Sequence, residues 1–236
     1  MSSETIELVR RFDLPSEASD RLAALLDLLA AADAPTSVHD PSRAVDVHIA
    51  DSLAGVEVAE IREAGLIADL GTGAGLPGLV LAAVLPRAHV ILVESARRKC
   101  AFLERAAEAM GLENVEIVHA RAEEWHDGLG RCDAVCARAV AALPVVCEYA
   151  APLLRAGGVL VAWKGAVEDR EAADAGAAAA ELGLAPDAVR SVVPYPSSER
   201  RTLHVLRKTS PTPPRFPRRA GIAAKRPLSV TTLPRT

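Results

Sequence analysis

The chain has 236 residues, half of them apolar, which is enough to bury the core of one medium-sized domain with a modest extension. This composition excludes fibrous, collagen-like and wholly disordered chains. All 31 acidic residues lie at or before Glu199, together with 17 of the 27 lysines and arginines, so residues 1–199 carry a net charge of −14. Residues 200–236 carry the other ten basic residues and a net charge of +10. This asymmetry indicates a polyanionic partner such as nucleic acid, and a tail that is merely solvated is the alternative.

The sequence shows no sign of a membrane segment, a secretory signal or a metal site. The longest uncharged stretch, Leu70–Pro86, has 17 residues and contains four glycines and two prolines, whereas a membrane span needs about 20 apolar residues. The first residues are acidic rather than basic, so no secretory signal is visible. The four cysteines form neither a CxxC pair nor a zinc spacing, which favours reduced, packed thiols in a cytoplasmic protein without a metal.

Helical and strand patterns follow one another along the chain. Apolar residues at helical spacing predict an amphipathic helix over residues 18–31 and a second helical segment from about Pro41 to Leu53. From residue 65 onward, short apolar runs predict buried strands at 67–70, 90–93, 115–118, 133–136 and 159–163. Between them, helices are expected near 77–84, 96–110 and 140–154, and after them a helix over about 168–182 and a strand near 202–207. Residues 209–214 contain three prolines and should be extended.

Strands that alternate with helices imply right-handed crossovers and a parallel sheet covered on both faces. We therefore expect an α/β fold with three parts. Residues 1–64 would form a small N-terminal helical extension, residues 65–208 the sheet domain, and residues 209–236 a basic, proline-rich tail.

The strongest local signal is a glycine loop that follows an expected strand and opens an expected helix: Asp69-Leu70-Gly71-Thr72-Gly73-Ala74-Gly75-Leu76-Pro77-Gly78. Glycines let a backbone turn tightly and approach a ligand, so this context predicts a nucleotide site. Asp69, at the end of the strand, would repel a pyrophosphate and attract a cationic group. Glu94 closes the next strand, where an acidic side chain accepts hydrogen bonds from ribose hydroxyls.

A cofactor with a ribose, a positive head and no phosphate fits this pair of carboxylates, and S-adenosylmethionine has all three properties. An NAD site is the main alternative, although Asp69 disfavours it. A tight turn that binds no ligand is the other alternative. After the third strand, the segment at Ala122 and Glu123 stands where such folds hold an adenine, although a carboxylate-rich helix start explains it equally well.

The fourth strand ends at Cys136-Ala137-Arg138-Ala139. Arg138 lies between small residues and cannot bury its charge without a partner, so we expect it to face the cleft, with a surface ion pair as the alternative. For Cys136, packing is favoured over nucleophilic catalysis. The motif that amino methylases of adenine or cytosine carry at this point, an Asn or Asp followed by two prolines and an aromatic residue, is absent.

Taken together, these residues resemble the small-subunit ribosomal RNA guanine-N7 methyltransferases, known as RsmG or glucose-inhibited division protein B. The elements that carry the resemblance span nearly the whole chain from about residue 34. They are His48-Ile49-Ala50-Asp51-Ser52-Leu53, the glycine loop with its Leu-Pro-Gly ending, Glu94, Arg121-Ala122-Glu123-Glu124, Ala137-Arg138-Ala139, Lys164-Gly165, Glu199-Arg200 and the basic end Arg215–Gly221.

The resemblance implies a Rossmann-like class I methyltransferase sheet that transfers a methyl group from S-adenosylmethionine to N7 of a guanine in 16S ribosomal RNA. It implies a cofactor held by Gly71, Leu76, Ala122, Glu123 and Arg138. From the loop itself we add Asp69, Gly73, Gly75 and Glu94 to the expected cofactor site.

For the reaction, the resemblance places His48 in the substrate cleft with Arg138, and Lys164 is expected at the same cleft or at a phosphate. Without it, His48, Asp51 and Ser52 would be an exposed polar face of a helix, and Lys164 a solvated strand end. Guanine N7 has an in-plane lone pair and no proton, so catalysis should rest on positioning rather than on a general base.

The RNA is expected to be 16S ribosomal RNA, either naked or in a 30S assembly particle. Phosphate contacts are expected from Arg200, Arg201, Arg207, Arg215, Arg218 and Arg219. The rival functions are an NAD(P)-dependent oxidoreductase with the same sheet and a non-catalytic rRNA-binding or assembly factor. The sequence leaves the oligomeric state open, and a monomer is favoured.

Overall fold

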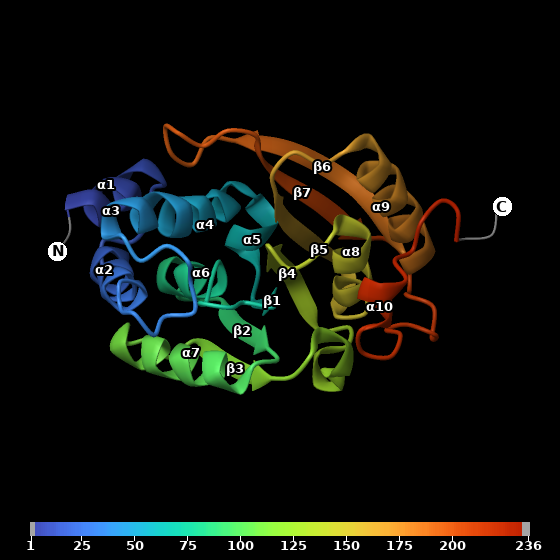
Figure 1. Ribbon diagram of the computed structural model, residues 1–236, viewed down its shortest axis with the longest axis horizontal. Helices are drawn as coiled ribbons and strands as arrows, with labels where there is room; N and C mark the ends of the chain where they lie inside the picture. Colours follow the sequence, from blue (N-terminus) through green and yellow to red (C-terminus); the bar gives the residue numbers. More distant parts are fainter. Residues whose placement is uncertain (1–2, 233–236) are drawn as a thin grey trace.

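Seven strands form one sheet in the order β3-β2-β1-β4-β5-β7-β6 in the computed structural model of the protein, which describes residues 3–232 (Figure 1). Strands β1 to β5 pair in parallel, and β7 runs antiparallel to both of its neighbours, β5 and β6. The strands are β1 Leu66–Leu70, β2 His89–Glu94, β3 Val115–His119, β4 Cys132–Arg138, β5 Leu154–Lys164, β6 Leu184–Val192 and β7 Arg201–Lys208.

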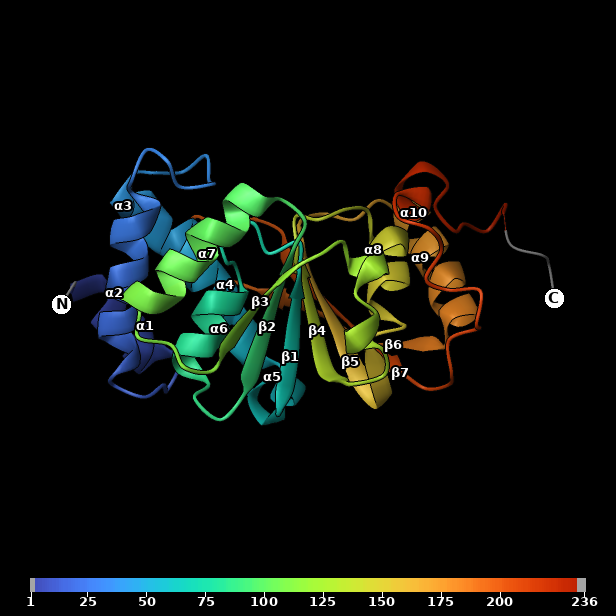
Figure 2. The ribbon, with the colours of Figure 1, turned by 90° about the horizontal axis from the view of Figure 1, so that it is seen from below.

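Helices cover both faces of the sheet (Figure 2). One face carries α6 and α7 with the N-terminal helices, and the other carries α8, α9 and α10. The α-helices are α1 Ser3–Arg11, α2 Ala18–Leu29, α3 Pro41–Ala44, α4 Asp51–Leu53, α5 Ala59–Glu63, α6 Gly78–Val84, α7 Arg97–Ala109, α8 Leu143–Ala150, α9 Asp169–Leu182 and α10 Ile222–Lys225. Other helical turns are the π-helix η1 Val45–Ala50 and the 3₁₀ helices η2 Ala54–Glu57, η3 Ala122–Glu124 and η4 His126–Gly128.

Alternate residues of the central strands face opposite sides of the sheet, as the two-residue period of a strand requires. Ile67 and Leu92 belong to the core on the side of α6 and α7, whereas Ala68 and Ile91 belong to the core on the side of α8 and α9. Because both sides of these strands are buried, the strands read as nearly continuous apolar runs.

One continuous helical run links α3, η1, α4 and η2, and it begins at Asp40. The Asp40 side chain accepts hydrogen bonds from the backbone N–H groups of Ser42 and Arg43, which caps the first turn. The helical segment expected at 41–53 is therefore confirmed, although it contains a π-helical section.

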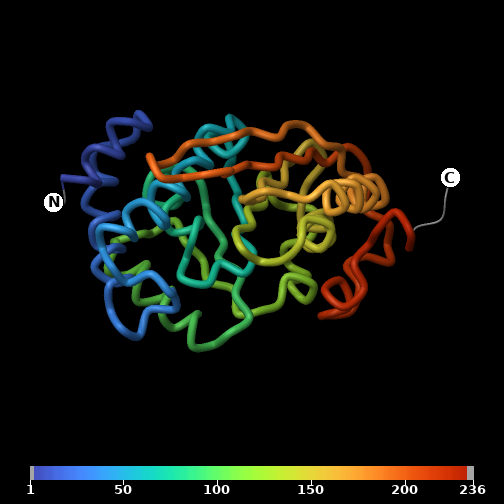
Figure 3. The backbone as a smooth tube through the Cα atoms, turned by 45° about the horizontal axis from the view of Figure 1, so that its top comes forward, coloured from blue at the N-terminus to red at the C-terminus, as the bar shows by residue number. Residues whose placement is uncertain are grey.

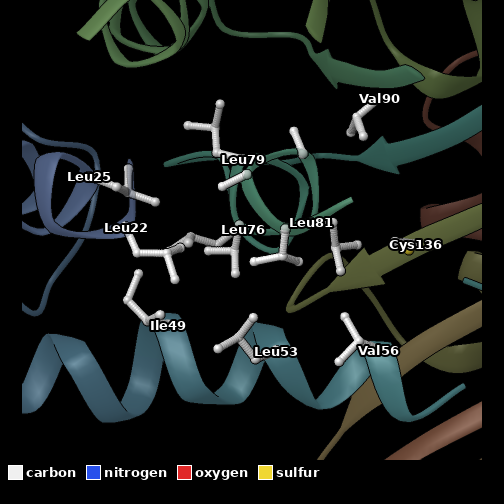
Figure 4. Close-up of a cluster of buried hydrophobic side chains, with 14 of the residues drawn as sticks. Leu22, Leu25, Ile49, Leu53, Val56, Leu76, Leu79, Leu81, Val90 and Cys136 are labelled. Carbon is white, nitrogen blue, oxygen red and sulfur yellow. The ribbon is translucent and has the colours of Figure 1, made fainter. Parts of the chain in front are cut away.

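This helical run packs against the sheet domain rather than standing apart from it. Figure 4 shows Ile49, Leu53 and Val56 pointing from the run toward α2 and α6, where they join the same apolar cluster as Leu22 and Leu79. The division of the chain at residues 64 and 208 stays a prediction, but the N-terminal helices and the sheet share one core.

The strands and helices expected from residue 65 onward are confirmed in place and type, with two exceptions in the sheet. The expectation of a parallel sheet is wrong for β7, because a loop joins it to β6 as a hairpin, and a hairpin makes antiparallel neighbours. Strand β6 was not expected, because Pro186 and Asp187 interrupt its apolar pattern. They are tolerated because β6 lies at the edge of the sheet and its register shifts between Pro186 and Ala188.

Four α-helices also differ from expectation. Helices α1, α5 and α10 were not expected, and α8 is shorter than the predicted 140–154. Pro144 suits only the first turn of α8, and Ala139 before it has a φ of +56°, so residues 140–142 form a loop. Among residues 3–232, none of the helices has the length and apolarity needed to cross a membrane.

The C-terminal segment returns along the body of the protein, with residues 209–214 in non-helical conformation as expected. Figure 3 shows this segment, in red, beside the part of the chain that contains α9. Phe216, Ala223 and Leu228 are buried in the core on the side of α8 and α9. The alternative of a merely solvated tail is therefore wrong for the described residues.

Gly55 lets the helical run approach β5. A Cβ at Gly55 would lie 2.5 Å from Cζ2 of Trp163, so Gly55→Ala should destabilise the protein by about 1–3 kcal/mol through overpacking. Gly176 lies inside α9 with open space around the position of a Cβ, so Gly176→Ala should stabilise it by about 0.5–1 kcal/mol. Urea unfolding measures both changes, and equal effects of the two substitutions would contradict the packing.

Candidate functional site

The functional residues gather where the strands β1, β2, β4 and β5 end. In a parallel sheet the carboxyl ends meet at one edge, which is where α/β folds bind ligands. Register pairs Arg138 at the end of β4 with Trp163 of β5, and Lys164 with Thr202. Because β7 is antiparallel, its first residue, Arg201, lies at this same edge.

Asp69 lies beneath the glycine loop and not at its mouth. The residue is fully buried, and its Oδ2 accepts hydrogen bonds from Oγ1 of Thr72 at 2.5 Å and from the backbone N–H of Gly78 at 2.8 Å. Its Oδ1 has no hydrogen-bond partner within residues 3–232. Burial raises the pKa of Asp69 from 3.8 to about 6. The expectation that Asp69 attracts a cationic ligand group at the mouth is therefore corrected, because the carboxylate holds the loop from below.

Glu94 supports the loop from the neighbouring strand. It is only 4% exposed, and its two oxygens accept hydrogen bonds from the backbone N–H groups of Gly73 at 3.1 Å and Ala96 at 2.8 Å. The Nζ of Lys99 lies 3.7 Å from Oε2. Glu94 thus sits beside the loop at the end of β2, as the sequence predicts, with both oxygens already in contact with the chain.

The first cavity, of about 210 Å³, opens above β1 and β2. It brings together Gly71, Ala122 and Glu123, which the sequence places in the cofactor site. Gly75 and Leu76 do not line it, since Leu76 is buried in the core and a Cβ at Gly75 would collide with Leu79.

Several residues of this cavity were not predicted as part of the cofactor site, among them Val140, Tyr149 and Ala224. Val140 and Ala224 have no polar side-chain atoms that could mark them, and Tyr149 lies in a mainly apolar helix outside the recognised motifs. Tyr149 lies beside Glu123 and Glu148, and burial together with these carboxylates raises its pKa.

The walls of the first cavity fit an adenosine. Most of the lining residues are apolar, and Arg121 and Glu123 add one charged side chain of each sign. Gly71 has a φ of +60°, and a Cβ there would lie 3.2 Å from Cγ2 of Val140. A side chain at this position would therefore narrow the first cavity. The residues present therefore fit the cofactor that the sequence indicates.

The second cavity, of about 240 Å³, shares Ala141 with the first and has a different character. Three cationic side chains line it: Arg138, Lys164 and Arg201. Trp163 and Asp51 also line this cavity. The sequence predicted Arg138 and Lys164 for the cleft and Arg201 for a phosphate contact, and the structure brings all three to one cavity.

Asp51 connects these groups. Its side chain is 5% exposed and lies 3.0 Å from Nη1 of Arg138 and 3.4 Å from Nε of Arg201. Nη1 of Arg138 also donates to the backbone oxygen of Val47, and the indole Nε1–H of Trp163 donates to the backbone oxygen of Asp51 at 2.8 Å. Burial lowers the pKa of Arg138, and the Asp51 carboxylate opposes this shift. Sequence reasoning placed Arg138 in the cleft but did not identify its partner, 87 residues earlier.

His48 lines neither of these two cavities. It is buried, its Nε2 lies 2.8 Å from Oγ1 of Thr36, and its Nδ1 has no hydrogen-bond partner within residues 3–232. Burial, with a contribution from nearby Arg138, lowers the pKa of His48 below its usual value. The reading of His48, Asp51 and Ser52 as an exposed polar face is wrong, because all three are buried.

Lys164 is paired rather than solvated. Its Nζ lies 2.7 Å from Oε1 of Glu171 and donates to the backbone oxygen of Ala141 at 3.3 Å. Glu171 also accepts from the backbone N–H of Leu143, so it fixes both the lysine and the start of α8.

The other arginines expected at the RNA divide into two groups. Arg200 and Arg219 are exposed and form no ion pair within the described chain. The other group is held by carboxylates of the body: Arg207 by Glu60 and Asp187, Arg215 by Glu181, and Arg218 by Glu148.

Residues 3–232 contain no group of three or more His, Cys, Asp or Glu side chains placed to hold a metal ion. All four cysteines are free and buried, and burial raises the pKa of Cys136 well above its usual value, which agrees with a packing role.

The sequence matches the family model described as "rRNA small subunit methyltransferase G" over residues 17–199. A ribosomal RNA small subunit methyltransferase G from Rubrobacter xylanophilus is 44% identical over 195 residues, which are 80% of this chain and 75% of that protein. The protein of the same name from Desulfitobacterium hafniense is 39% identical over 196 residues, 82% of this chain and 81% of that protein.

Among solved structures, a mutant of MtNAS in complex with S-adenosylmethionine aligns with a TM-score of 0.56 at 16% identity. The alignment covers 83% of this chain and 78% of that one. At this identity, the likeness concerns the fold.

The buried carboxyl of Asp69 should make the stability of the protein depend on pH. Its pKa is raised when the chain folds, so the stability that the protonated form contributes is present below pH 4 and is lost as the pH rises through 6. Between pH 4 and 7, the free energy of unfolding of the wild type should therefore fall by on the order of 3 kcal/mol relative to that of Asp69→Asn. Urea unfolding at four pH values measures this difference, with Asp27→Asn as an exposed control. Parallel pH curves for the wild type and Asp69→Asn would contradict the assignment.

Proposed function

Because the chain belongs to the rRNA small subunit methyltransferase G family, we propose that its two cavities divide the family reaction between them. That reaction is the transfer of a methyl group from S-adenosylmethionine to N7 of a guanine in 16S ribosomal RNA. The first cavity takes the cofactor, and the second takes the guanine. The observation that carries this proposal is that the cavities adjoin at Ala141, one with mainly apolar walls and one lined by three cations.

The fold agrees with this assignment. The sheet is the Rossmann-like class I methyltransferase sheet that the sequence predicts, with the antiparallel β7 next to β5. The small N-terminal helical extension covers one face of it.

In the first cavity, the glycine loop and the segment at Ala122 and Glu123 hold the adenosine. Glu94 is the acceptor for the ribose hydroxyls, since its carboxylate lies beside the loop with lone pairs beyond those used by Gly73 and Ala96. Asp69 acts through the loop, which it fixes from below. When bound, S-adenosylmethionine supplies a methyl group activated by a positively charged sulfur.

In the second cavity, Arg138 and Lys164 position the base, and Arg201, which is 38% exposed at its side chain, reaches toward the phosphates. Guanine N7 has a lone pair and no proton, so no side chain has to accept a proton from it. The chain's contribution is therefore orientation of the base against the methyl group and control of the local charge.

Asp51 and Glu171 balance the positive charge of the second cavity. The guanine ring gains positive charge as N7 becomes methylated, and unpaired cations beside it would oppose the reaction. Asp51 neutralises Arg138, and Glu171 neutralises Lys164, so both cations can donate hydrogen bonds without raising the barrier. His48 is a positioning residue in this scheme, because it packs beside Arg138 outside both cavities.

The RNA lies along the edge that carries Arg200 and Arg201, and the exposed Arg219 extends the contact. N7 lies in the deep major groove of A-form RNA, so the target guanine must be unpaired or opened. The substrate is 16S ribosomal RNA, either naked or in a 30S assembly particle, which places the protein in the cytoplasm. Arg207, Arg215 and Arg218 are less available, because carboxylates of the body hold them.

Transfer of labelled methyl groups tests the proposal. Full-length protein, S-adenosylmethionine and 16S ribosomal RNA or 30S particles should yield N7-methylguanine at one position, mapped by cleavage at that modified base. The single-turnover rate should stay level between pH 6.5 and 8.5, because no general base has to lose a proton. RNA without a guanine at the mapped position serves as the control.

Two outcomes would contradict the account. Binding of cofactor and RNA without transfer would indicate a non-catalytic assembly factor. A rate that rises with the titration of one group near pH 7 would show that a side chain acts as a base.

A further inference from the structure

The first cavity has a wall that lies outside residues 17–199, the range matched by the family model. Ala224 of α10 lines it together with Ala122 and Tyr149. Residues 215–228, which we call the C-terminal cap, thus reach the same cavity as the glycine loop, although they follow it by more than 100 residues. In Figure 2 α10 of the cap lies beside α8 and α9.

We infer that the C-terminal cap is part of the cofactor site: it forms the outer wall of the adenine end of the first cavity and sets the affinity for S-adenosylmethionine. This inference rests on the proposed placement of the adenosine in that cavity. It gives the basic tail a second task besides RNA contact.

A buried carboxylate holds the cap in place. The Glu148 side chain, on α8, is only 1% exposed and would be an uncompensated buried charge without a partner. Arg218 supplies this partner in a bidentate contact, with its Nε 2.7 Å from Oε1 and its Nη2 2.5 Å from Oε2. Nη2 of Arg218 also donates to the backbone oxygen of Arg226, which closes the cap on itself. Docking of the cap is thereby linked to the stability of α8.

A second contact ties the cap to the adenine loop. The backbone N–H of Gly221 donates to Oε1 of Glu123 at 2.8 Å, and Glu123 itself lines the cavity. Any movement of the cap away from the body therefore releases a residue of the proposed cofactor site.

Apolar contacts complete the docking. Phe216, Ala223 and Leu228 are 9%, 1% and 7% exposed, and all three belong to the core that includes α8 and α9. The guanidinium groups of Arg215 and Arg218 lie 5.1 and 6.0 Å from the centre of the Phe216 ring. Two of the cap's positive charges therefore contribute to its own docking, although the Arg215 side chain stays 63% exposed.

Affinity for the cofactor should follow the fraction of molecules with a docked cap. If loss of the Arg218–Glu148 pair lowers that fraction from near one to about one tenth, the apparent dissociation constant rises about tenfold. The same factor should apply to S-adenosylmethionine and to adenosine alone, because the cap contacts the adenine end.

Titration calorimetry on the full chain tests this inference with Arg218→Gln and, as its matched control, Lys225→Gln. Both substitutions remove one positive charge from the cap, but Lys225 is exposed and makes no ion pair within the described residues. We expect Arg218→Gln to bind S-adenosylmethionine and adenosine about tenfold more weakly. Lys225→Gln should bind both like the wild type.

A second pair of variants leaves the ion pair intact. The indole in Ala224→Trp would project into the cavity, so cofactor affinity should fall at least about tenfold. In Lys225→Trp, the added ring lies outside that cavity and affinity should not change. If circular dichroism shows that Arg218→Gln does not fold, the two tryptophan variants test whether the C-terminal cap affects cofactor affinity.

The results separate this inference from the proposed function. Wild-type affinity for S-adenosylmethionine in both Arg218→Gln and Ala224→Trp would overturn the inferred role of the C-terminal cap, while methyl transfer could still proceed. A wild-type protein that binds no S-adenosylmethionine would overturn the proposed function instead.

Discussion

A single buried carboxylate, that of Asp51, makes the arrangement at the sheet's carboxyl edge possible. Two arginines from distant parts of the chain meet at its carboxylate: Arg138, whose side chain is largely buried, and Arg201, which is partly exposed. Without a counter-charge, the burial of Arg138 would cost several kcal/mol, and the side chain would turn outward. Asp51 supplies that charge from the N-terminal helical run, so this run completes the site as well as covering the sheet.

The same principle applies to other charged groups at this edge, which are held by an opposite charge or by backbone groups of the protein. Glu171 holds Lys164, Glu148 holds Arg218, and backbone N–H groups hold Glu94. Groups held in this way need little rearrangement when charge changes beside them, which is how preorganised polar groups assist a reaction. This organisation agrees with the proposed reaction, which relies on positioning rather than on proton transfer.

Much of this could be predicted from local sequence. The glycine loop between a strand and a helix, and the ends of successive apolar runs, gave the sheet and the places of Gly71, Ala122 and Arg138, because these signals depend on near neighbours. The pairing of Asp51 with Arg138 and the docking of the C-terminal cap depend on residues far apart in the chain. Asp69 shows a different limit: its position in the loop was correct, but its burial under Gly78 could not be read from spacing, so its role was misassigned.

A double-mutant cycle on Asp51 and Arg138 tests the central claim most directly, with the free energy of unfolding in urea as the readout. The account predicts that Asp51→Asn costs about 3–5 kcal/mol in the wild type, because it leaves Arg138 buried without its carboxylate. In an Arg138→Met background, the same substitution should cost at least about 2 kcal/mol less. Equal costs in the two backgrounds, within about 0.5 kcal/mol, would show that the two residues are energetically independent and would contradict the account.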